Sequence, residues 1–236
     1  MRRHHFTLSL SFTLSLSLTL SLSFLLFSCQ TDSYEKGEGE YSLMQADFAD
    51  LSVNGQKQAI SVMTDDGNTY LLTAPVTAQW IETADTTYRS IVYYNKVGAG
   101  QAELMGLGIV PTLQPVEHWR FKEQHQDPVG FESAWVSPTG RYLNIGLFLK
   151  SGRIDDEEMP HVIGLAQDTV YVRDDGRRTA CYRLLHSQND VPEYYTNRRY
   201  VSILLPQQRP DTVRLSVRTY DGDVEKTFVT QTTQKQ

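Results

Sequence analysis

The feature that most constrains this chain is an uncharged run near its N-terminus, LSLSFTLSLSLTLSLSFLLFSC, in which Leu and Ser or Thr nearly alternate over residues 8–29. Alternation with a period of two is typical of a strand, but a strand this long without a turn residue would be an exposed, aggregation-prone edge. Arg2 and Arg3 precede the run and the first acid is Asp32, as in a secretory signal with a basic start and an apolar centre. In a helix, the alternation spreads Leu over every face and lets each Ser hydroxyl bond to a carbonyl one turn earlier, so the run can enter a membrane. We therefore interpret residues 1–28 as a signal peptide.

The signal ends at a motif for lipid attachment. Residues 26–29, Leu-Phe-Ser-Cys, resemble a bacterial lipobox, in which a small residue precedes the cysteine that receives lipid. The apolar run stops at Cys29 and polarity rises directly after it, which favours a lipoprotein over an uncleaved membrane anchor. The sequence thus predicts lipidation of Cys29 and a cell-envelope protein held on the outer membrane by its lipid. The residues after Cys29 leave open whether it faces the periplasm or the cell exterior.

Charge and cysteine content narrow the classes of partner. From Cys29 onward the chain has 20 Lys and Arg against 28 Asp and Glu, a formal charge of −8. This charge argues against nucleic acid as a partner, because phosphate binding depends on clustered cations. Once Cys29 carries lipid, Cys181 is the one other cysteine, so an internal disulfide is excluded and the hydrophobic core must hold the fold.

The remaining sequence predicts an all-β protein of two domains. Residues 29–40 are rich in Asp, Glu, Gly and Ser and are expected to form an acidic tether. After it, short runs rich in Val, Ile, Tyr and Thr recur between turn signals, with no helical stripe of useful length. We expect a five-stranded unit in residues 41–121 and a β-sandwich in residues 122–236. The expected strands are residues 41–48, 59–64, 70–73, 89–97 and 103–110 in the first unit, and 131–136, 142–149, 161–165, 169–172, 181–185, 200–205, 213–220 and 224–230 in the second.

Two expected hairpin turns predict which residues of neighbouring strands pair. Residues 65–68, Asp-Asp-Gly-Asn, form a hairpin signal in which Gly or Asn can take positive φ. Near the C-terminus, a two-residue turn at Asp221-Gly222 would pair Arg218 with Glu225 and Leu215 with Phe228. This register places Val213, Leu215, Val217 and Phe228 on one apolar face.

Known catalytic signatures are missing from the sequence. It contains no nucleophile elbow, no paired-His zinc helix, no Walker loop and no dinucleotide fingerprint. The four histidines after the signal, His118, His125, His161 and His186, stand at no recognised ligand spacing, so we expect neither a metal nor a cofactor. A hydrolase would need His186 and Asp190 beside a nucleophile such as Ser187, and three neighbouring loop residues do not make such a site.

One long connection has the composition of a recognition surface. Residues 184–200, LLHSQNDVPEYYTNRRY, carry aromatic side chains beside hydrogen-bonding groups between two expected strands. The alternative is a loop packed by its own tyrosines and fixed by Asp and Asn turns. The candidate ligand-binding residues are Trp135, His186, Asn189, Asp190, Tyr194 and Tyr195. In the glycan interpretation, the Trp135, Tyr194 and Tyr195 rings are exposed stacking platforms.

The order of motifs resembles the NigD-like lipoproteins of Gram-negative bacteria. After the lipobox come VMTDDGNTYLL, YRSIVYYNKV, YLNIGLF, HVIGLAQD, YRLLHSQNDVPEYYTNRRYVSILLP and DTVRLSVRTYDG, and together they cover nearly all of the chain after Cys29. The resemblance implies an N-terminal OB-like β-barrel followed by an antiparallel β-sandwich. It implies a bacteriocin-associated, immunity-like or accessory role, without established catalytic residues. An OB barrel presents its face to saccharide, nucleic acid or protein, so fold alone does not choose the ligand.

We therefore expect a non-enzymatic, lipid-anchored accessory or interaction protein of the cell envelope, with an envelope protein as partner. Binding of an envelope glycan is the first alternative and hydrolysis the second.

Overall fold

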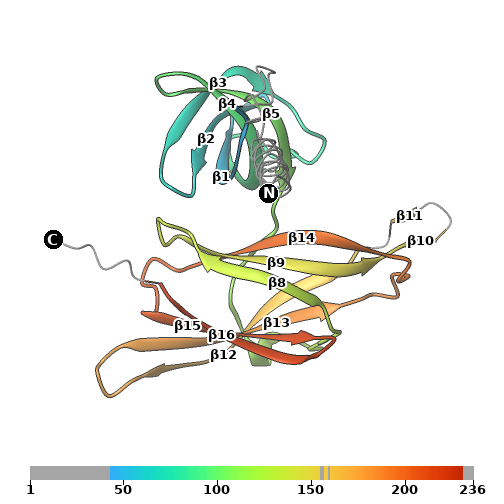
Figure 1. Ribbon diagram of the computed structural model, residues 1–236. Coiled ribbons are helices and arrows are strands. Elements are labelled where there is room, and N and C mark those ends of the chain that lie inside the picture. The colour runs from blue at the N-terminus through green and yellow to red at the C-terminus, as the bar shows by residue number, and fades with distance from the viewer. Residues whose placement is uncertain (1–42, 155–156, 159, 231–236) are drawn as a thin grey trace, which may run out of the picture. The chain divides into compact units, whose positions relative to one another are not determined.

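The computed structural model describes residues 43–154, 157–158 and 160–230 (Figure 1). The expected lipidation site, Cys29, lies outside the described residues, as do the signal and tether. The fold is all-β, with one short 3-10 turn, η1 (His118–Arg120), as the expectation required. No helix in the described part of the chain is both long and apolar enough to cross a membrane.

The first domain is a closed five-stranded barrel. Its strands are β1 (Gln45–Val53), β2 (Ala59–Thr64), β3 (Thr69–Val76), β4 (Thr87–Gly98) and β5 (Gln101–Ile109). They are ordered β1-β2-β3-β5-β4, and β4 pairs with β1 to close the barrel. Alternate residues of each strand fill the interior, which is why Ala49, Leu51, Val62, Val92 and Tyr94 are buried together.

The predicted Asp-Asp-Gly-Asn turn joins β2 to β3. Gly67 has a φ of 84°, and its amide donates to the Thr64 carbonyl. Positive φ is accessible to glycine at little steric cost, so this residue fixes the hairpin as the sequence indicated.

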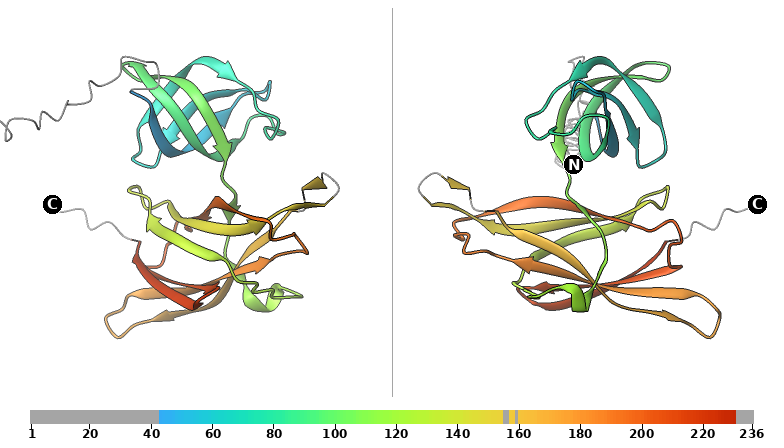
Figure 2. Two further views of the ribbon diagram at one scale, coloured as in Figure 1. Left: turned by 45° about the vertical axis from the view of Figure 1, so that its right-hand side comes forward. Right: turned by 180° about the vertical axis from the view of Figure 1, so that it is seen from behind.

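The second domain is a sandwich of two sheets (Figures 1 and 2). One sheet has the order β16-β15-β13-β12-β7 and the other β6-β14-β9-β8. Their strands are β6 (Thr112–Leu113), β7 (Val116–Glu117), β8 (Gly130–Val136), β9 (Tyr142–Ser151), β12 (Val162–Val172), β13 (Arg178–Ser187), β14 (Tyr195–Leu204), β15 (Thr212–Thr219) and β16 (Gly222–Val229), with a separate two-stranded ribbon of β10 (Arg153–Ile154) and β11 (Glu157–Glu158). The β12–β13 hairpin extends past its neighbours (Figures 1 and 2).

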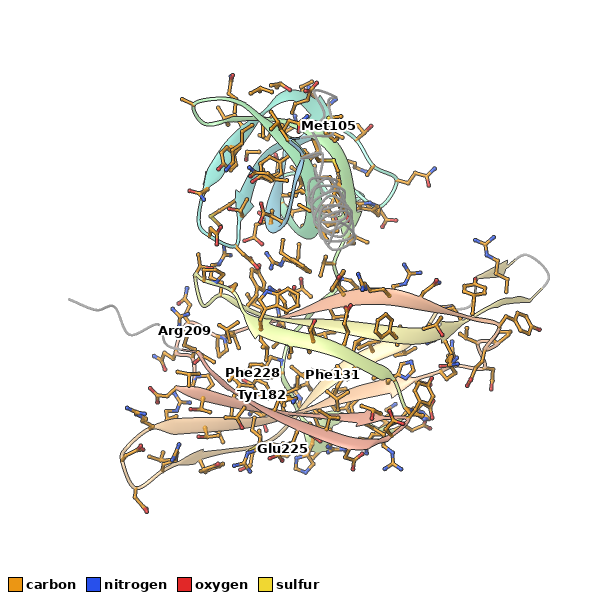
Figure 3. The ribbon with its side chains drawn as sticks, viewed as in Figure 1. Met105, Phe131, Tyr182, Arg209, Glu225 and Phe228 are labelled. Carbon is orange, nitrogen blue, oxygen red and sulfur yellow. The ribbon has the colours of Figure 1, made fainter. Side chains whose placement is uncertain are left out.

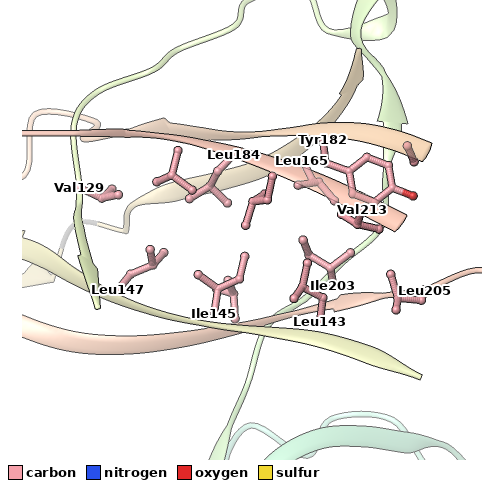
Figure 4. Packing of buried hydrophobic residues seen from close by; sticks show 14 of the residues in the cluster. Val129, Leu143, Ile145, Leu147, Leu165, Tyr182, Leu184, Ile203, Leu205 and Val213 are labelled. Carbon is pink, nitrogen blue, oxygen red and sulfur yellow. The ribbon is translucent and has the colours of Figure 1, made fainter. Parts of the chain in front are cut away.

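The two sheets enclose one aliphatic core. Leu143, Ile145 and Leu147 of β9 face Leu165, Leu184 and their neighbours on the opposite sheet (Figure 4). Phe131 and Phe228 pack against the edge of the same core, whereas Glu225 lies on the outside of β16 (Figure 3). Period-two alternation in each strand produces this division between the two faces.

The C-terminal hairpin has the predicted faces but a different register. Thr219 pairs with Gly222, so the turn residues are Tyr220 and Asp221 rather than Asp221 and Gly222. The Thr219 hydroxyl fixes this turn, because it accepts from the Asp221 amide and donates to the Gly222 carbonyl. Arg218 consequently lies 3.8 Å from Asp223 instead of pairing with Glu225.

The short strands that follow the barrel pair with the sandwich. The last barrel strand ends at Ile109, and the short strands β6 and β7 pair with β14 and β12 of the sandwich. We therefore propose that the sandwich begins near Thr112.

Candidate binding groove between barrel and sandwich

Strand β4 presents one of its faces to the contact between the barrel and the sandwich. On β4, Arg89, Ile91 and Tyr93 alternate with interior residues and point out of the barrel. Their exposure rises along the strand, from 5% at Arg89 to 38% at Tyr93. The contact is therefore closed at Arg89 and open at Tyr93.

The closed end is a buried polar cluster centred on Arg89. Its Nη2 donates to Asp65 Oδ2 at 2.7 Å and to Asn144 Oδ1 at 3.0 Å, and its Nε donates to Ser202 Oγ at 3.2 Å. Asn144 in turn donates from Nδ2 to Asp65 Oδ2 at 2.8 Å and accepts from Ser202 Oγ at 2.7 Å. Asn144 and Ser202 are fully buried and belong to the sandwich, whereas Arg89 and Asp65 belong to the barrel. These bonds join the two domains.

A second carboxylate extends the cluster. Asp50 of β1 accepts from Arg141 Nη1 at 2.5 Å and from the Tyr142 hydroxyl at 2.9 Å, and it lies 3.6 Å from Arg89 Nη1. The Arg89 guanidinium also lies over the Tyr142 ring, 3.9 Å from its centroid. Burial and the neighbouring Asp50 raise the pKa of Tyr142 to about 12, so its hydroxyl stays a donor.

Aromatic packing lies beside the polar cluster. The Phe48 ring of the barrel meets Trp135 and Tyr200 of the sandwich edge-to-face, with centroids 5.4 Å and 5.3 Å apart. A Cβ at position 146 would lie 2.6 Å from Glu132 Oε2 and 3.3 Å from the Tyr200 ring, so a larger residue there would displace the Glu132 side chain. Trp135, which the sequence put forward as a ligand platform, thus packs in the contact between the domains.

The connecting segment is bound to both domains. The Val110 amide donates to the Arg89 carbonyl, and the Ser202 amide donates to the Pro111 carbonyl, each at 2.9 Å. These bonds, the polar cluster and the aromatic contacts set the distance between β4 and β14.

Beyond the closed end, the contact opens into a groove of about 620 Å³. One wall comes from the barrel and the connection, with Tyr93, Ile109 and Pro111. The other wall comes from the sandwich, where Arg198 and Tyr200 of β14 lie beside the apolar residues Leu149, Ile163 and Val191. Ile109 is 49% exposed, so the groove offers apolar surface to a partner.

Basic side chains line the groove, although the chain is acidic overall. Arg198, Arg199 and His161 line it, and none of its described lining residues is an Asp or Glu. Arg198 Nη2 is held 2.6 Å from Glu132 Oε1, which fixes the position of the guanidinium. A ligand with both apolar and carboxylate groups matches this lining best.

A histidine pair lies at one end of the groove. His186 is buried, and its Nδ1 donates to the Asp127 carbonyl at 3.0 Å. Its Nε2 must then accept from His161 Nδ1, also 3.0 Å away, with the two rings stacked. Burial lowers the pKa of His186, and this pattern of bonds fits a neutral ring.

The predicted loop forms a separate hollow of about 480 Å³, lined by Asn189, Asp190, Asp127, Glu193 and Tyr220 among others. Asn189 and Asp190 have φ values of 52° and 57° and are the central residues of a turn closed by Val191 N donating to the Gln188 carbonyl. Asn189 Nδ2 also donates to the Pro160 carbonyl. The loop is therefore fixed by local Asn and Asp turns, which was the alternative to a recognition surface. It also borders a hollow.

The remaining predicted residues do not converge. Tyr194 and Tyr195 are 75% and 46% exposed, and Tyr194 lies in the bend that precedes β14, whereas Tyr195 is the first residue of that strand. His186 faces the core with Leu184, whereas Ser187 follows it on the other face of β13. The pair therefore lacks the arrangement that hydrolysis requires.

Sequence reasoning missed the groove and the Arg89 cluster. Arg89 and Ser202 are 113 positions apart, and no local pattern reports their pairing. The available signal was weak: Arg89 begins one expected strand, and Asp50 follows another by two residues.

Comparison with solved structures identifies the architecture. A NigD-like immunity protein from Bacteroides caccae superposes with a TM-score of 0.58 and 22% identity, covering 77% of this chain and 91% of that one. The chain has the NigD-like fold. A predicted toxin-related protein from Parabacteroides distasonis (TM-score 0.58, 18% identity, 78% of this chain and 91% of that one) and a predicted lipoprotein from Bacteroides fragilis (0.57, 12%, 81% and 100%) share it. No protein-family model and no curated protein matches the sequence. The NigD-like likeness confirms the expected fold of barrel followed by sandwich.

Proposed function

We propose that this protein is a non-enzymatic interaction or accessory protein of the cell envelope that holds a protein partner in the groove between its barrel and its sandwich. The observation that carries the proposal is a groove between two domains whose separation is set by the bonds of the buried Arg89 cluster. A site formed before binding avoids the cost of ordering its walls when a partner arrives. The partner segment is extended, with apolar side chains toward Ile109 and a carboxylate toward Arg198.

Anchoring at the membrane belongs to the same proposal. The lipobox ending at Cys29 predicts the lipid, and a protein of the same fold is named as a predicted lipoprotein. A C-terminal tag probed on intact cells reports which side of the outer membrane the domains face. Cys29→Ala should release the protein from the membrane fraction, and retention of that variant contradicts the anchor.

The names of the structural neighbours support a protein partner. One protein of this fold is named an immunity protein and another a predicted toxin-related protein. An immunity-like protein acts by binding a protein toxin. A groove that accepts a segment with acidic and apolar side chains is suited to such binding. A non-enzymatic role is also supported by the His186 ring, whose two nitrogens are both engaged in hydrogen bonds.

The test is site-specific photo-crosslinking in the native cell. A photoreactive residue replaces Tyr93 or Ile109 in the groove, and Val172 on the β12–β13 hairpin, 66% exposed, serves as the control position. We expect one cross-linked protein from the two groove positions and not from the control, and we expect Arg198→Glu to abolish it by reversing the charge. Equal cross-linking from Val172, or no groove product in cells that retain the folded protein, refutes the proposal.

Glycan binding remains a second candidate at the hollow beside Asn189 and Asp190. The observation in its favour is a set of amide and carboxylate groups next to Tyr220, which is 46% exposed. Such groups pair with sugar hydroxyls while a ring stacks on the sugar. Glycan arrays with the wild type and Tyr220→Ala test it, and an array signal that survives the substitution contradicts this site.

A further inference from the structure

A second cavity, of about 670 Å³, lies at one end of the sandwich. The segment after β14, Leu204 to Gln207, forms part of its wall, and the short connection between β6 and β7 forms another part. It shares no lining residue with the groove between the domains. It therefore needs an explanation of its own.

A buried phenol faces this cavity. Tyr182 of β13 is 2% exposed and lines the cavity. Figure 4 shows its hydroxyl pointing out of the aliphatic core, at the end where Leu205 lies. Within the described part of the chain, no donor or acceptor bonds to this hydroxyl, whose oxygen is open to the cavity and so to water. A ligand that enters the cavity can take the place of water as the partner of this hydroxyl.

The guanidinium of Arg209 lines the same cavity and is held in place by backbone carbonyls. Arg209 Nη1 donates to the Gly140 carbonyl at 2.5 Å and to the Thr139 carbonyl at 3.4 Å. Gly140 has a φ of 68°, and a Cβ there would come within 2.0 Å of Nη1, so glycine is required for this seat. Arg209 and Tyr182 both line this cavity. The two backbone carbonyls hold the Arg209 guanidinium in place. Because a carbonyl carries no net charge, they do not neutralise it.

The charge balance of the cavity favours an anion. Arg141 also lines it, but Asp50 neutralises that guanidinium at 2.5 Å. Among the described residues no carboxylate pairs with Arg209, and none lines the cavity. One positive charge therefore remains in a chain that is acidic overall. A guanidinium can bind a carboxylate through two parallel, charge-assisted hydrogen bonds.

The other lining groups indicate what carries the carboxylate. Two glutamine amides, Gln114 and Gln207, each offer a donor and an acceptor, which match the donor and acceptor of a peptide unit, whereas Gln167 Nε2 already donates to Glu117 Oε1 at 3.0 Å. Leu204, Leu205 and two prolines supply aliphatic contact. No aromatic ring face is available for stacking a sugar, because the Tyr182 ring lies within the core.

We propose that this cavity binds the free C-terminal carboxylate of a peptide, with the carboxylate on Arg209 and a peptide carbonyl accepting from the Tyr182 hydroxyl. The site is separate from the groove and does not depend on the function proposed for it.

The test uses the mature chain with Cys29→Ala, labelled with ¹⁵N. Two probes are compared by NMR: a pool of N-acetylated tetrapeptides with free C-terminal carboxylates, and the same pool with C-terminal amides. We expect the carboxylate pool to shift the Arg209 Nε–H signal and the Gln114 and Gln207 side-chain amide signals. Binding of the amide pool should be about tenfold weaker or more, because it lacks the charge-assisted bonds.

Variants separate the site from the fold. Arg209→Gln and Tyr182→Phe should each weaken binding, the first about tenfold and the second about three- to tenfold. Arg214→Gln is the matched control, because Arg214 pairs with Glu225 on the outer face of the sheet and should leave binding unchanged. Signal dispersion and the unfolding midpoint of each variant check the fold, and Tyr182→Phe retains the ring that the core needs.

Three outcomes overturn the proposal. Equal binding of the two pools excludes carboxylate recognition. No shift with either pool at about millimolar concentration means that solvent alone fills the cavity. Tighter binding of galacturonate than of the carboxylate pool assigns the site to an acidic sugar instead of a peptide.

Discussion

Arg89→Met tests whether the buried polar cluster holds the barrel to the sandwich. The substitution keeps an apolar stem and removes the guanidinium, so Asp65 loses a cation at 2.7 Å and Ser202 and Asn144 lose a donor. The side chains of Arg89 and Asp65 are only 2% and 14% exposed, so water replaces little of the lost contact. Asp50 is affected less, because it keeps Arg141 and the Tyr142 hydroxyl.

The expected loss of stability follows from these contacts. Removing one partner of a buried ion pair costs about 3–5 kcal/mol in the free energy of unfolding. Asp65 retains the bond from Asn144 Nδ2 at 2.8 Å, which puts the cost at the lower end, about 3 kcal/mol. For a domain of this size that loss lowers the unfolding midpoint by about 6–12 °C.

Urea unfolding of the Cys29→Ala chain, followed by tryptophan fluorescence and circular dichroism, measures the effect. Arg218→Met is the matched control, because its pair with Asp223 spans 3.8 Å between side chains that are 56% and 66% exposed. Such a pair contributes about 0–1 kcal/mol. A second substitution, Asp65→Leu, should recover part of the loss in Arg89→Met by removing the stranded carboxylate. If Arg89→Met costs no more than Arg218→Met, the cluster does not hold the domains together.

Two further predictions concern the sandwich. Ile145→Ala should lower the free energy of unfolding by about 2–5 kcal/mol in urea titrations, because the side chain is fully buried in the core, whereas Val172→Ala, 66% exposed, should change it by less than about 0.5 kcal/mol. An equal effect of the two would contradict the core assignment. Burial lowers the pKa of His186 from its ordinary 6.5, so the folded chain binds fewer protons there than the unfolded chain. The stability that this group contributes is therefore complete above pH 6.5 and declines as the pH falls from 6.5 to the lower folded-state pKa. His186→Asn should flatten this part of the stability profile in unfolding titrations between about pH 8 and about pH 5, and an unchanged profile would assign the dependence to another group.

The strands could be predicted because their signals are local. The Asp-Asp-Gly-Asn turn and the alternation on each side of it defined β2 and β3, since glycine and period-two patterning act within a few residues. The C-terminal hairpin shows the limit of the same reasoning. Shifting the pairing by two residues keeps every side chain on its face, so Val213 and Phe228 remain on the apolar side in both registers. The Thr219 hydroxyl decided between them, and hydrophobic patterning does not report it.

The functional surfaces could not be predicted because they depend on pairing between distant segments. Asp50, Arg89 and Tyr93 lie on the outer faces of barrel strands, where the sequence pattern predicts solvent. They became a polar cluster and a groove wall only when the sandwich covered that face. The same covering placed Trp135 against Phe48. Local composition instead pointed to Asn189 and Asp190, whose polarity serves a turn.

The buried Arg89 cluster and the groove both use strands β4 and β14, so they should be coupled. Arg89 does not line the groove, yet it stands two residues before Ile91 and four before Tyr93, which do. If the cluster sets the distance between β4 and β14, Arg89→Met should weaken cross-linking at Ile109 under conditions in which the variant is still folded. Binding at Arg209, within the sandwich alone, should be unaffected by the same substitution, because Arg209 is seated on the Gly140 turn of that domain. Parallel loss at both sites would mean that Arg89→Met acts by unfolding the chain, whereas loss at the groove alone would show that the buried cluster prepares the binding surface.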